Sequence, residues 1–120
     1  MDTVTNLDKL ESITSLQSTV SKLENACSRM TQKGVNTSLV KKRLKAVRIG
    51  LAMLENAWEQ KTNNYVKDEI AEARNVLLGL LPSIESSYAR SKDGSPQNTL
   101  LKRRLKALEL AIDVMDDLQN

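Results

Sequence analysis

A seven-residue segment that occurs twice constrains the fold of this chain more than any other feature. Residues 41–47 read KKRLKAV, and residues 102–108 read KRRLKAL. At the same offset of 61 residues, further positions match in type: Leu16 with Leu77, Val20 with Leu81, Leu23 with Ile84, Glu24 with Glu85, Arg29 with Arg90 and Leu51 with Ile112. An ungapped match of this length predicts two tandem copies of one unit, repeat 1 at about 5–60 and repeat 2 at about 64–120.

Apolar residues in both copies recur at alternating steps of three and four, which is the pattern of helices in a coiled-coil-like bundle. In repeat 2 the steps run through Val66, Ile70, Ala73, Leu77, Leu80 and Ile84, and then through Leu101, Leu105, Leu108, Ile112 and Met115. We expect helices at about 5–32, 36–60, 64–90 and 98–118. With short connections they predict an all-α, antiparallel up-down-up-down four-helix bundle, a single domain over 1–120 made of two tandem helical-hairpin repeats.

Local signals set most of the predicted boundaries. Gly34 is placed to end the first helix, and Ser95 or Asn98 to cap the fourth. The join at 61–64 is ambiguous, because it has capping residues but no glycine or proline. A turn there lets a monomer close its own core, whereas one continuous helix from 36 to 90 would require a homodimer with exchanged hairpins. We favour the turn.

Two positions inside the helices carry further expectations. Pro82 should kink or break the third helix near Leu81, because proline removes a backbone hydrogen bond. Gly50 matches Ala111 in the other copy. Small residues at both positions indicate the close approach of a neighbouring helix, at some cost in helix propensity.

The composition argues against an enzyme. The chain has no histidine, one cysteine and no glycine-rich phosphate loop, so it lacks the commonest general base and the commonest transition-metal ligand. We therefore predict no catalytic residues, no cofactor and no metal. The sequence shows no secretory signal and no apolar run of membrane length, which favours an intracellular, cytoplasmic protein without a transmembrane segment.

The net charge of +3 conceals an uneven distribution. In an up-down-up-down bundle, one end would collect twelve of the 18 basic residues: Arg29, Lys33, Lys41, Lys42, Arg43, Lys45, Arg90, Lys92, Lys102, Arg103, Arg104 and Lys106. The opposite end would collect twelve of the 15 acidic residues: Asp2, Asp8, Glu11, Glu55, Glu59, Asp68, Glu69, Glu72, Glu109, Asp113, Asp116 and Asp117. Basic residues in the first turns of the second and fourth predicted helices interact unfavourably with the helix dipole. Because this cost occurs in both repeats, it indicates that the basic end has a function. The alternative is that these residues are only a solvated helix surface.

These features favour a non-enzymatic protein-interaction or assembly module, which binds an acidic protein surface or a second copy of itself through its basic end. The candidate residues are Lys41, Lys42, Arg43, Lys45, Lys102, Arg103, Arg104, Lys106, Arg29 and Arg90. The alternative is sequence-nonspecific binding of nucleic acid or another anionic phosphate. Specific base recognition is disfavoured, because only Tyr88 supplies an aromatic ring near that end.

Three short segments resemble the N-terminal helical region of Gag polyproteins from insect retrotransposons. They are 43–46 (RLKA), 54–58 (LENAW) and 65–70 (YVKDEI), and the range that contains them, 43–70, is about a quarter of the chain. The proline-rich approach to a capsid domain that such proteins carry downstream is absent. The resemblance implies a role in assembly.

Overall fold

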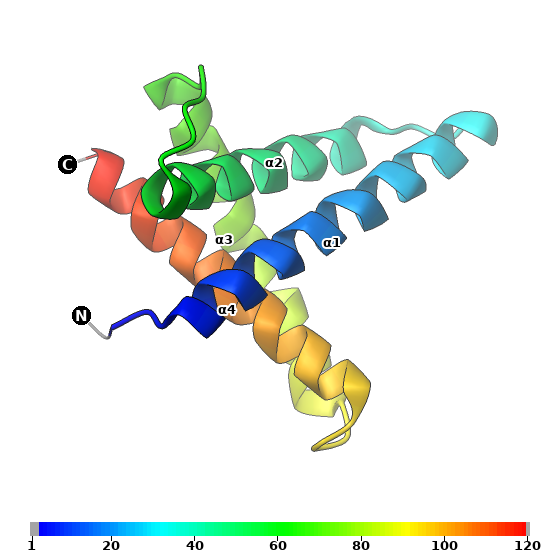
Figure 1. The fold of residues 1–120 in the computed structure, drawn as a ribbon. Coiled ribbons are helices and arrows are strands. Elements are labelled where there is room, and N and C mark those ends of the chain that lie inside the picture. Colours follow the sequence, from blue (N-terminus) through cyan, green and yellow to red (C-terminus); the bar gives the residue numbers. More distant parts are fainter. Residues whose placement is uncertain (1–2, 120) are drawn as a thin grey trace.

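The computed structural model describes residues 3–119, and these fold into four α-helices (Figure 1). The helices are α1 (Asn6–Gln32), α2 (Ser38–Glu59), α3 (Lys67–Arg90) and α4 (Pro96–Gln119). Each boundary lies within three residues of the predicted one. The prediction of an all-α four-helix bundle is confirmed, whereas the tandem duplication stays a prediction.

The ends of the helices follow from local hydrogen bonds. At the start of α1, the Thr5 hydroxyl accepts a hydrogen bond from the Asp8 backbone N–H at 3.0 Å, and the Asp8 carboxylate accepts one from the Thr5 N–H at 3.1 Å. This reciprocal pair is a capping box. α1 ends just before Gly34, whose φ of 71° lies in the left-handed region that glycine tolerates. At α4, the Ser95 hydroxyl accepts from the Asn98 N–H at 3.1 Å, so Ser95 is the N-cap.

A non-helical segment, residues 60–66, joins α2 to α3. Gln60 adopts a left-handed φ of 55°, and the Asn56 side-chain amide donates a hydrogen bond to the Lys61 carbonyl at 3.0 Å. This geometry ends α2 and turns the chain. The predicted turn is confirmed, and the alternative of one continuous helix from 36 to 90 is wrong.

Two details of the third predicted helix are corrected. Val66, which the periodicity placed inside the helix, is its N-cap and is exposed. Of the two effects expected of Pro82, the break is wrong, because α3 continues to Arg90, and the kink stays a prediction. Pro82 and Leu78, whose carbonyl loses its hydrogen bond to the proline, are both exposed. Water can therefore satisfy that carbonyl, which makes the proline tolerable.

The helices form two antiparallel hairpins, α1–α2 and α3–α4, which cross each other (Figure 1). α2 and α4 each contact both helices of the other hairpin, whereas α1 and α3 do not meet within residues 3–119. The molecule measures 43 × 39 × 21 Å along its principal axes, which is the flattened shape of a cross. The α1–α2 loop and the α3–α4 loop therefore lie at separate corners (Figure 1). The expectation that both loops share one end of the bundle is wrong.

The crossing buries two faces of α2. One face, with apolar residues at steps of three and four as in the other helices, is buried at Val40, Leu44, Val47 and Leu54, and a second face is buried at Ala46, Ile49, Gly50 and Met53. A Cβ atom placed on Gly50 would lie 3.5 Å from the Ala111 Cβ and 3.2 Å from the Leu77 Cδ1. The close helix approach predicted from Gly50 and Ala111 is therefore confirmed.

The α1–α4 and α2–α3 interfaces use positions related by the 61-residue offset, but they differ in polarity. On α1 the buried residues facing α4 include Ser12, Ser15 and Thr19. Their counterparts on α3 are Ala73, Val76 and Leu80. The α1–α4 interface is thus the more polar of the two.

Candidate interaction surface

The loop end of the α1–α2 hairpin carries basic residues and no acidic ones. Between Glu24 and Glu55 the chain has no acidic residue and seven basic ones: Arg29, Lys33, Lys41, Lys42, Arg43, Lys45 and Arg48. Two of the seven are held in ion pairs with other helices. The Lys45 Nζ lies 3.3 Å from a Glu69 carboxylate oxygen on α3, and an Arg48 guanidinium nitrogen lies 2.5 Å from one of Glu24 on α1.

The remaining five side chains are exposed, and none forms an ion pair with any residue in the range 3–119. We call these five the basic tip: Arg29, Lys33, Lys41, Lys42 and Arg43. Figure 1 shows that the α1–α2 loop extends past the crossing, away from α3 and α4. Lys42, at the inner edge of the tip, also lines a cleft with Glu72 and Val76 of α3. Arg29, Lys41, Lys42 and Arg43 belong to the predicted set, and Lys33 belonged to the predicted basic end.

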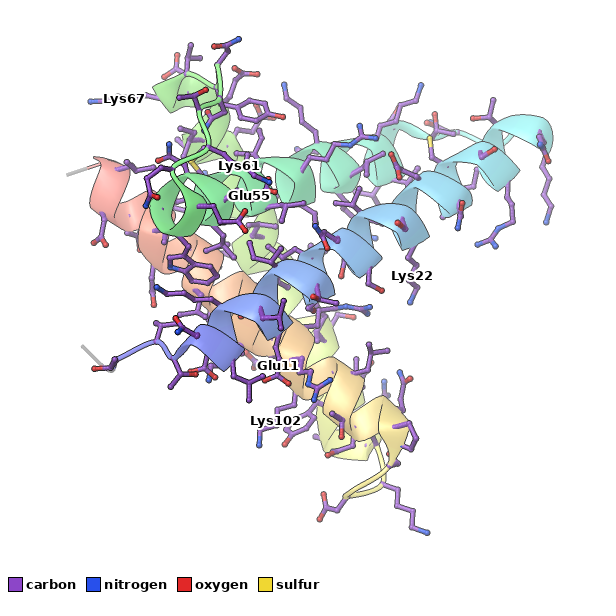
Figure 2. All side chains as sticks on the ribbon, viewed as in Figure 1. Glu11, Lys22, Glu55, Lys61, Lys67 and Lys102 are labelled. Carbon is purple, nitrogen blue, oxygen red and sulfur yellow. The ribbon has the colours of Figure 1, made fainter. Side chains whose placement is uncertain are left out.

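The basic residues of α4 are placed differently, because the start of α1 lies across them. Lys106 Nζ is 2.8 Å from an Asp8 oxygen, and an Arg103 guanidinium nitrogen is 2.7 Å from a Glu11 oxygen. Glu11 and Lys102 are labelled on these neighbouring helices in Figure 2. The acidic first turns of α1 therefore neutralise α4 locally, instead of lying at the far end of the molecule. Asp2, which was also assigned to the acidic end, lies outside the described residues.

Arg104 is buried between α4 and α1, with only 9% of its surface exposed. Its Nε donates a hydrogen bond to the Thr19 hydroxyl at 3.1 Å, and that hydroxyl donates to the Ser15 carbonyl at 2.8 Å. Burial lowers the pKa of Arg104 from its usual value. The Ser15 hydroxyl has no hydrogen-bond partner among the described residues. Arg104 thus acts in helix packing, and a partner cannot reach most of it.

Of the ten predicted residues, the structure brings four together at the basic tip. Arg90 and Lys102 are exposed but belong to the other hairpin. Lys45, Arg103 and Lys106 are ion-paired within the chain. The two hairpins therefore do not contribute equally to one surface.

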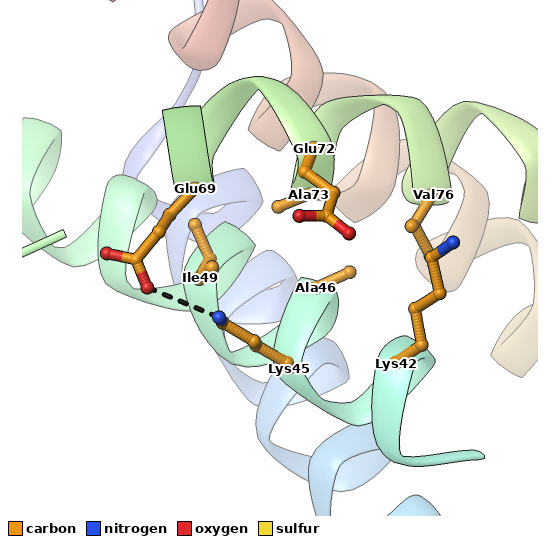
Figure 3. A pocket seen from close by; sticks show the side chains of 8 residues that line it. All are labelled: Lys42, Lys45, Ala46, Ile49, Glu69, Glu72, Ala73 and Val76. Carbon is orange, nitrogen blue, oxygen red and sulfur yellow. Dashed lines mark ion pairs between the residues drawn. The ribbon is translucent and has the colours of Figure 1, made fainter. Parts of the chain in front are cut away.

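Two ion pairs between the hairpins correspond at the 61-residue offset, whereas Arg48–Glu24 and Arg74–Asp116 have no counterpart. Lys45 and Lys106 are equivalent positions, as are their partners Glu69 and Asp8. Both carboxylates also accept a hydrogen bond from the backbone N–H of the residue three positions earlier, Val66 and Thr5. Figure 3 shows the cleft around Lys45 and Glu69, where Lys42 and Glu72 also project. The Lys45–Glu69 and Lys106–Asp8 contacts thus occupy matching positions in the two halves of the chain, and the duplication stays a prediction.

The same hydrogen bonds shift the acid–base equilibria of both carboxyls. The pKa of Asp8 is lowered first by the hydrogen bond from Lys106 and then by those from Thr5. The pKa of Glu69 is lowered first by the backbone hydrogen bond from Val66 and then by Lys45. Both groups are therefore held as carboxylates, and neither is poised to transfer a proton near neutral pH.

Lys61 closes the other end of α2. Its ammonium lies 3.3 Å from a Glu55 oxygen and 3.4 Å from a Glu59 oxygen, and Figure 2 shows it beside Glu55. These hydrogen bonds raise the pKa of Lys61, that from Glu55 contributing most. A cation at a helix C-terminus also interacts favourably with the helix dipole.

Sequence reasoning missed a groove at this end of the molecule. It has a volume of about 620 Å³ and lies between the segment before α1, the end of α2 and the second half of α4. We call it the Trp58 groove. Its apolar lining includes Ala57, Trp58, Leu110 and Val114, and its acidic lining includes Glu109, Asp113 and Asp117. The spacing of the three acidic residues, four apart along one helix, was the signal that could have found it.

Comparison with known proteins gives no further guidance: no family model, no curated protein and no solved structure matches the chain. Among the described residues, no three or more His, Cys, Asp or Glu side chains gather where they could hold a metal ion. None of the helices within 3–119 combines the length and apolar character needed to cross a membrane.

Proposed function

We propose that this protein is a non-enzymatic interaction module whose basic tip binds an acidic surface of another protein molecule. One observation carries the proposal. Arg29, Lys33, Lys41, Lys42 and Arg43 are exposed at the end of one hairpin and have no ion-pair partner within 3–119, whereas Lys45, Arg103 and Lys106 have one.

The energetics of α2 support a use for this charge. Lys41, Lys42 and Arg43 lie in the first two turns of the helix, where the positive end of the helix dipole disfavours basic side chains. No acidic residue lies in the first turn to offset them. A cluster of unpaired cations raises the local potential and speeds the encounter with an anionic partner.

Exposed apolar side chains beside the charges favour a protein partner over a phosphate backbone. Val35 in the α1–α2 turn is 51% exposed, and Leu39 in the first turn of α2 is 58% exposed. Leu39 shares a helix face with Lys42 and Arg43, three and four residues later. Protein interfaces combine apolar contacts with arginine, whereas contacts to phosphate need charge alone.

The test is the charge reversal Lys33→Glu with Lys41→Glu. One change disfavours and the other favours the dipole of its helix, so stability should hardly change. The matched control is Lys22→Glu with Lys92→Glu, two exposed lysines away from the tip with the same change in net charge. The probe is poly-L-glutamate, with binding followed by fluorescence anisotropy at rising salt.

The wild type and the control should bind poly-L-glutamate equally, and the tip variant at least tenfold more weakly. The affinity should fall as salt rises, because salt screens exposed charges beyond about 8 Å at physiological ionic strength. Equal binding by the tip variant and the control would refute the proposal. Two unrelated 20-base-pair DNA duplexes serve as probes for the alternative function, nonspecific nucleic-acid binding. Tighter, tip-dependent binding of both duplexes than of poly-L-glutamate would replace the proposed function with nonspecific nucleic-acid binding.

A further inference from the structure

The Trp58 groove and the basic tip lie at opposite ends of the molecule. In Figure 1 the chain termini and the end of α2 gather on the left, and the α1–α2 loop lies on the right. Trp58 and Lys42 are 16 residues apart on the same helix, which corresponds to about 24 Å along its axis. The tip of one molecule therefore cannot fill its own groove.

The chemistry of the groove suits a basic, partly apolar ligand. Trp58 is half-buried, and Leu110 and Val114 extend the apolar lining beside it. Asp113 and Asp117 are exposed and form no ion pair with any residue in the described part of the chain. Lys9, which lines a neighbouring hollow with Trp58, already has its Nζ 6.0 Å from the ring centroid, and Lys106, the basic residue in the groove lining, is paired with Asp8.

The basic tip has the complementary arrangement. Leu39 is exposed and shares a face with Lys42 and Arg43, so one apolar and two cationic groups project from one turn of helix. Asp113 and Asp117 are also one turn apart on α4, about 6 Å along its axis. A tip that places Leu39 against Trp58 and Leu110 brings the cationic side chains of Lys42 and Arg43 towards the acidic wall of the groove.

We propose that the Trp58 groove receives the basic tip of a second copy of this chain. This inference rests on the proposed function and names the partner of the basic tip. The two surfaces differ, so the contact is heterologous: each molecule offers one tip and one groove, and association continues head to tail. Charge complementarity orients the pair, and the apolar contact supplies the part of the binding that salt does not screen.

The experiment measures self-association by sedimentation velocity for three proteins. They are the wild type, a second tip variant that changes the two proposed contact residues (Lys42→Glu with Arg43→Glu) and a groove variant (Asp113→Lys with Asp117→Lys). The groove variant should fold, because both side chains are exposed and lysine near a helix C-terminus suits the dipole. The wild type should form species larger than dimers as concentration rises, and each variant alone should remain monomeric.

Mixing the two variants tests the head-to-tail geometry. The groove variant has an intact tip and the second tip variant an intact groove, so an equimolar mixture should form 1:1 dimers and nothing larger. The four changes combined in one chain should restore self-association, because the opposite charges are then exchanged. Trp58 is the only tryptophan, so its fluorescence should change when the groove is filled.

Three results would overturn the inference. The first is a wild type that stays monomeric at about 1 mM, the concentration range of the weakest specific complexes. The second is a groove variant that associates like the wild type. The third is a variant mixture that gives no heterodimer. The binding of poly-L-glutamate to the tip is measured separately, so the proposed function can survive each of these outcomes.

Discussion

A methyl group added at Gly50 should stabilise the fold less than one added at Gly79. Both glycines lie inside helices, but a Cβ on Gly50 would meet Leu77 and Ala111 at the crossing, whereas a Cβ on Gly79 meets nothing within 4 Å. Replacing a glycine inside a helix by alanine gains about 0.8–1 kcal/mol of helix propensity. Gly79→Ala should show that gain.

At Gly50 packing opposes the same gain. The new methyl would lie 3.2 Å from the Leu77 Cδ1, and Leu77 is fully buried, so it cannot move aside into solvent. Gly50→Ala should therefore gain less than Gly79→Ala. Gly50→Leu forces three more carbons into the crossing and should destabilise the fold by about 1–3 kcal/mol, the usual range for overpacking.

Thermal unfolding followed by circular dichroism measures the difference. For a chain of 120 residues, an unfolding entropy of about 2.1 cal/mol/K per residue converts 1 kcal/mol into roughly 4 °C of Tm. Gly50→Leu should unfold about 6–15 °C below Gly79→Leu, which is expected to keep part of its propensity gain. Equal Tm values for the two leucine variants would refute the close crossing of α2 and α4.

Three further predictions concern stability. Leu44→Ala should lower the free energy of unfolding by about 2–5 kcal/mol, and Leu105→Ala by less, because Leu44 is buried and Leu105 is half-buried. Urea unfolding measures both losses, and a larger loss at Leu105 would contradict the burial. The pKa values of Asp8 and Glu69 are lowered in the fold, so their contribution to stability is complete above their unfolded values of about 3.9 and 4.3 and is lost as the pH falls below about 4. Asp8→Asn should therefore be less stable than the wild type at pH 7, and the gap should narrow at pH 3 in urea titrations; a constant gap would show that the ion pair contributes nothing. The pKa of Lys61 is raised in the fold, so the contribution of this residue to stability is complete below about pH 10 and is lost as the pH rises through the pKa of the folded state. Lys61→Met should therefore match the stability of the wild type only at strongly alkaline pH.

Helix positions were predictable from the sequence because their signals are local. Gly34 and Ser95 set their helix ends through their own backbone and side-chain geometry. The close approach at Gly50 and Ala111 was also predictable, since small side chains at matched positions leave room for a second helix backbone. Val66 was misplaced because apolar periodicity does not distinguish a cap from the first buried turn.

The crossing of the hairpins was not predictable from the apolar stripe alone. That stripe describes one face of α2, whereas the angle between the hairpins depends on the second buried face, at Ala46, Ile49, Gly50 and Met53. The candidate site changed for the same reason. Asp8 and Glu11 neutralise the basic segment of α4 only because α1 crosses α4 there, and a charge count along the sequence carries no such information.

The polar interface between α1 and α4 has a consequence for the order in which the fold opens. α1 is covered by α2 and α4 but not by α3, and the residues it buries against α4 include Ser15, whose hydroxyl is unsatisfied, and Thr19, which bonds Arg104. Releasing α1 returns these polar groups to water, so the α4 side of the helix opposes the release less than an apolar interface would, and the apolar side with the fully buried Leu16 supplies most of the resistance. Its amide protons should therefore exchange with solvent through a sub-global opening in which α2, α3 and α4 remain folded. Those three helices are then the last cooperative unit to unfold, and the first helix of the chain is the least protected.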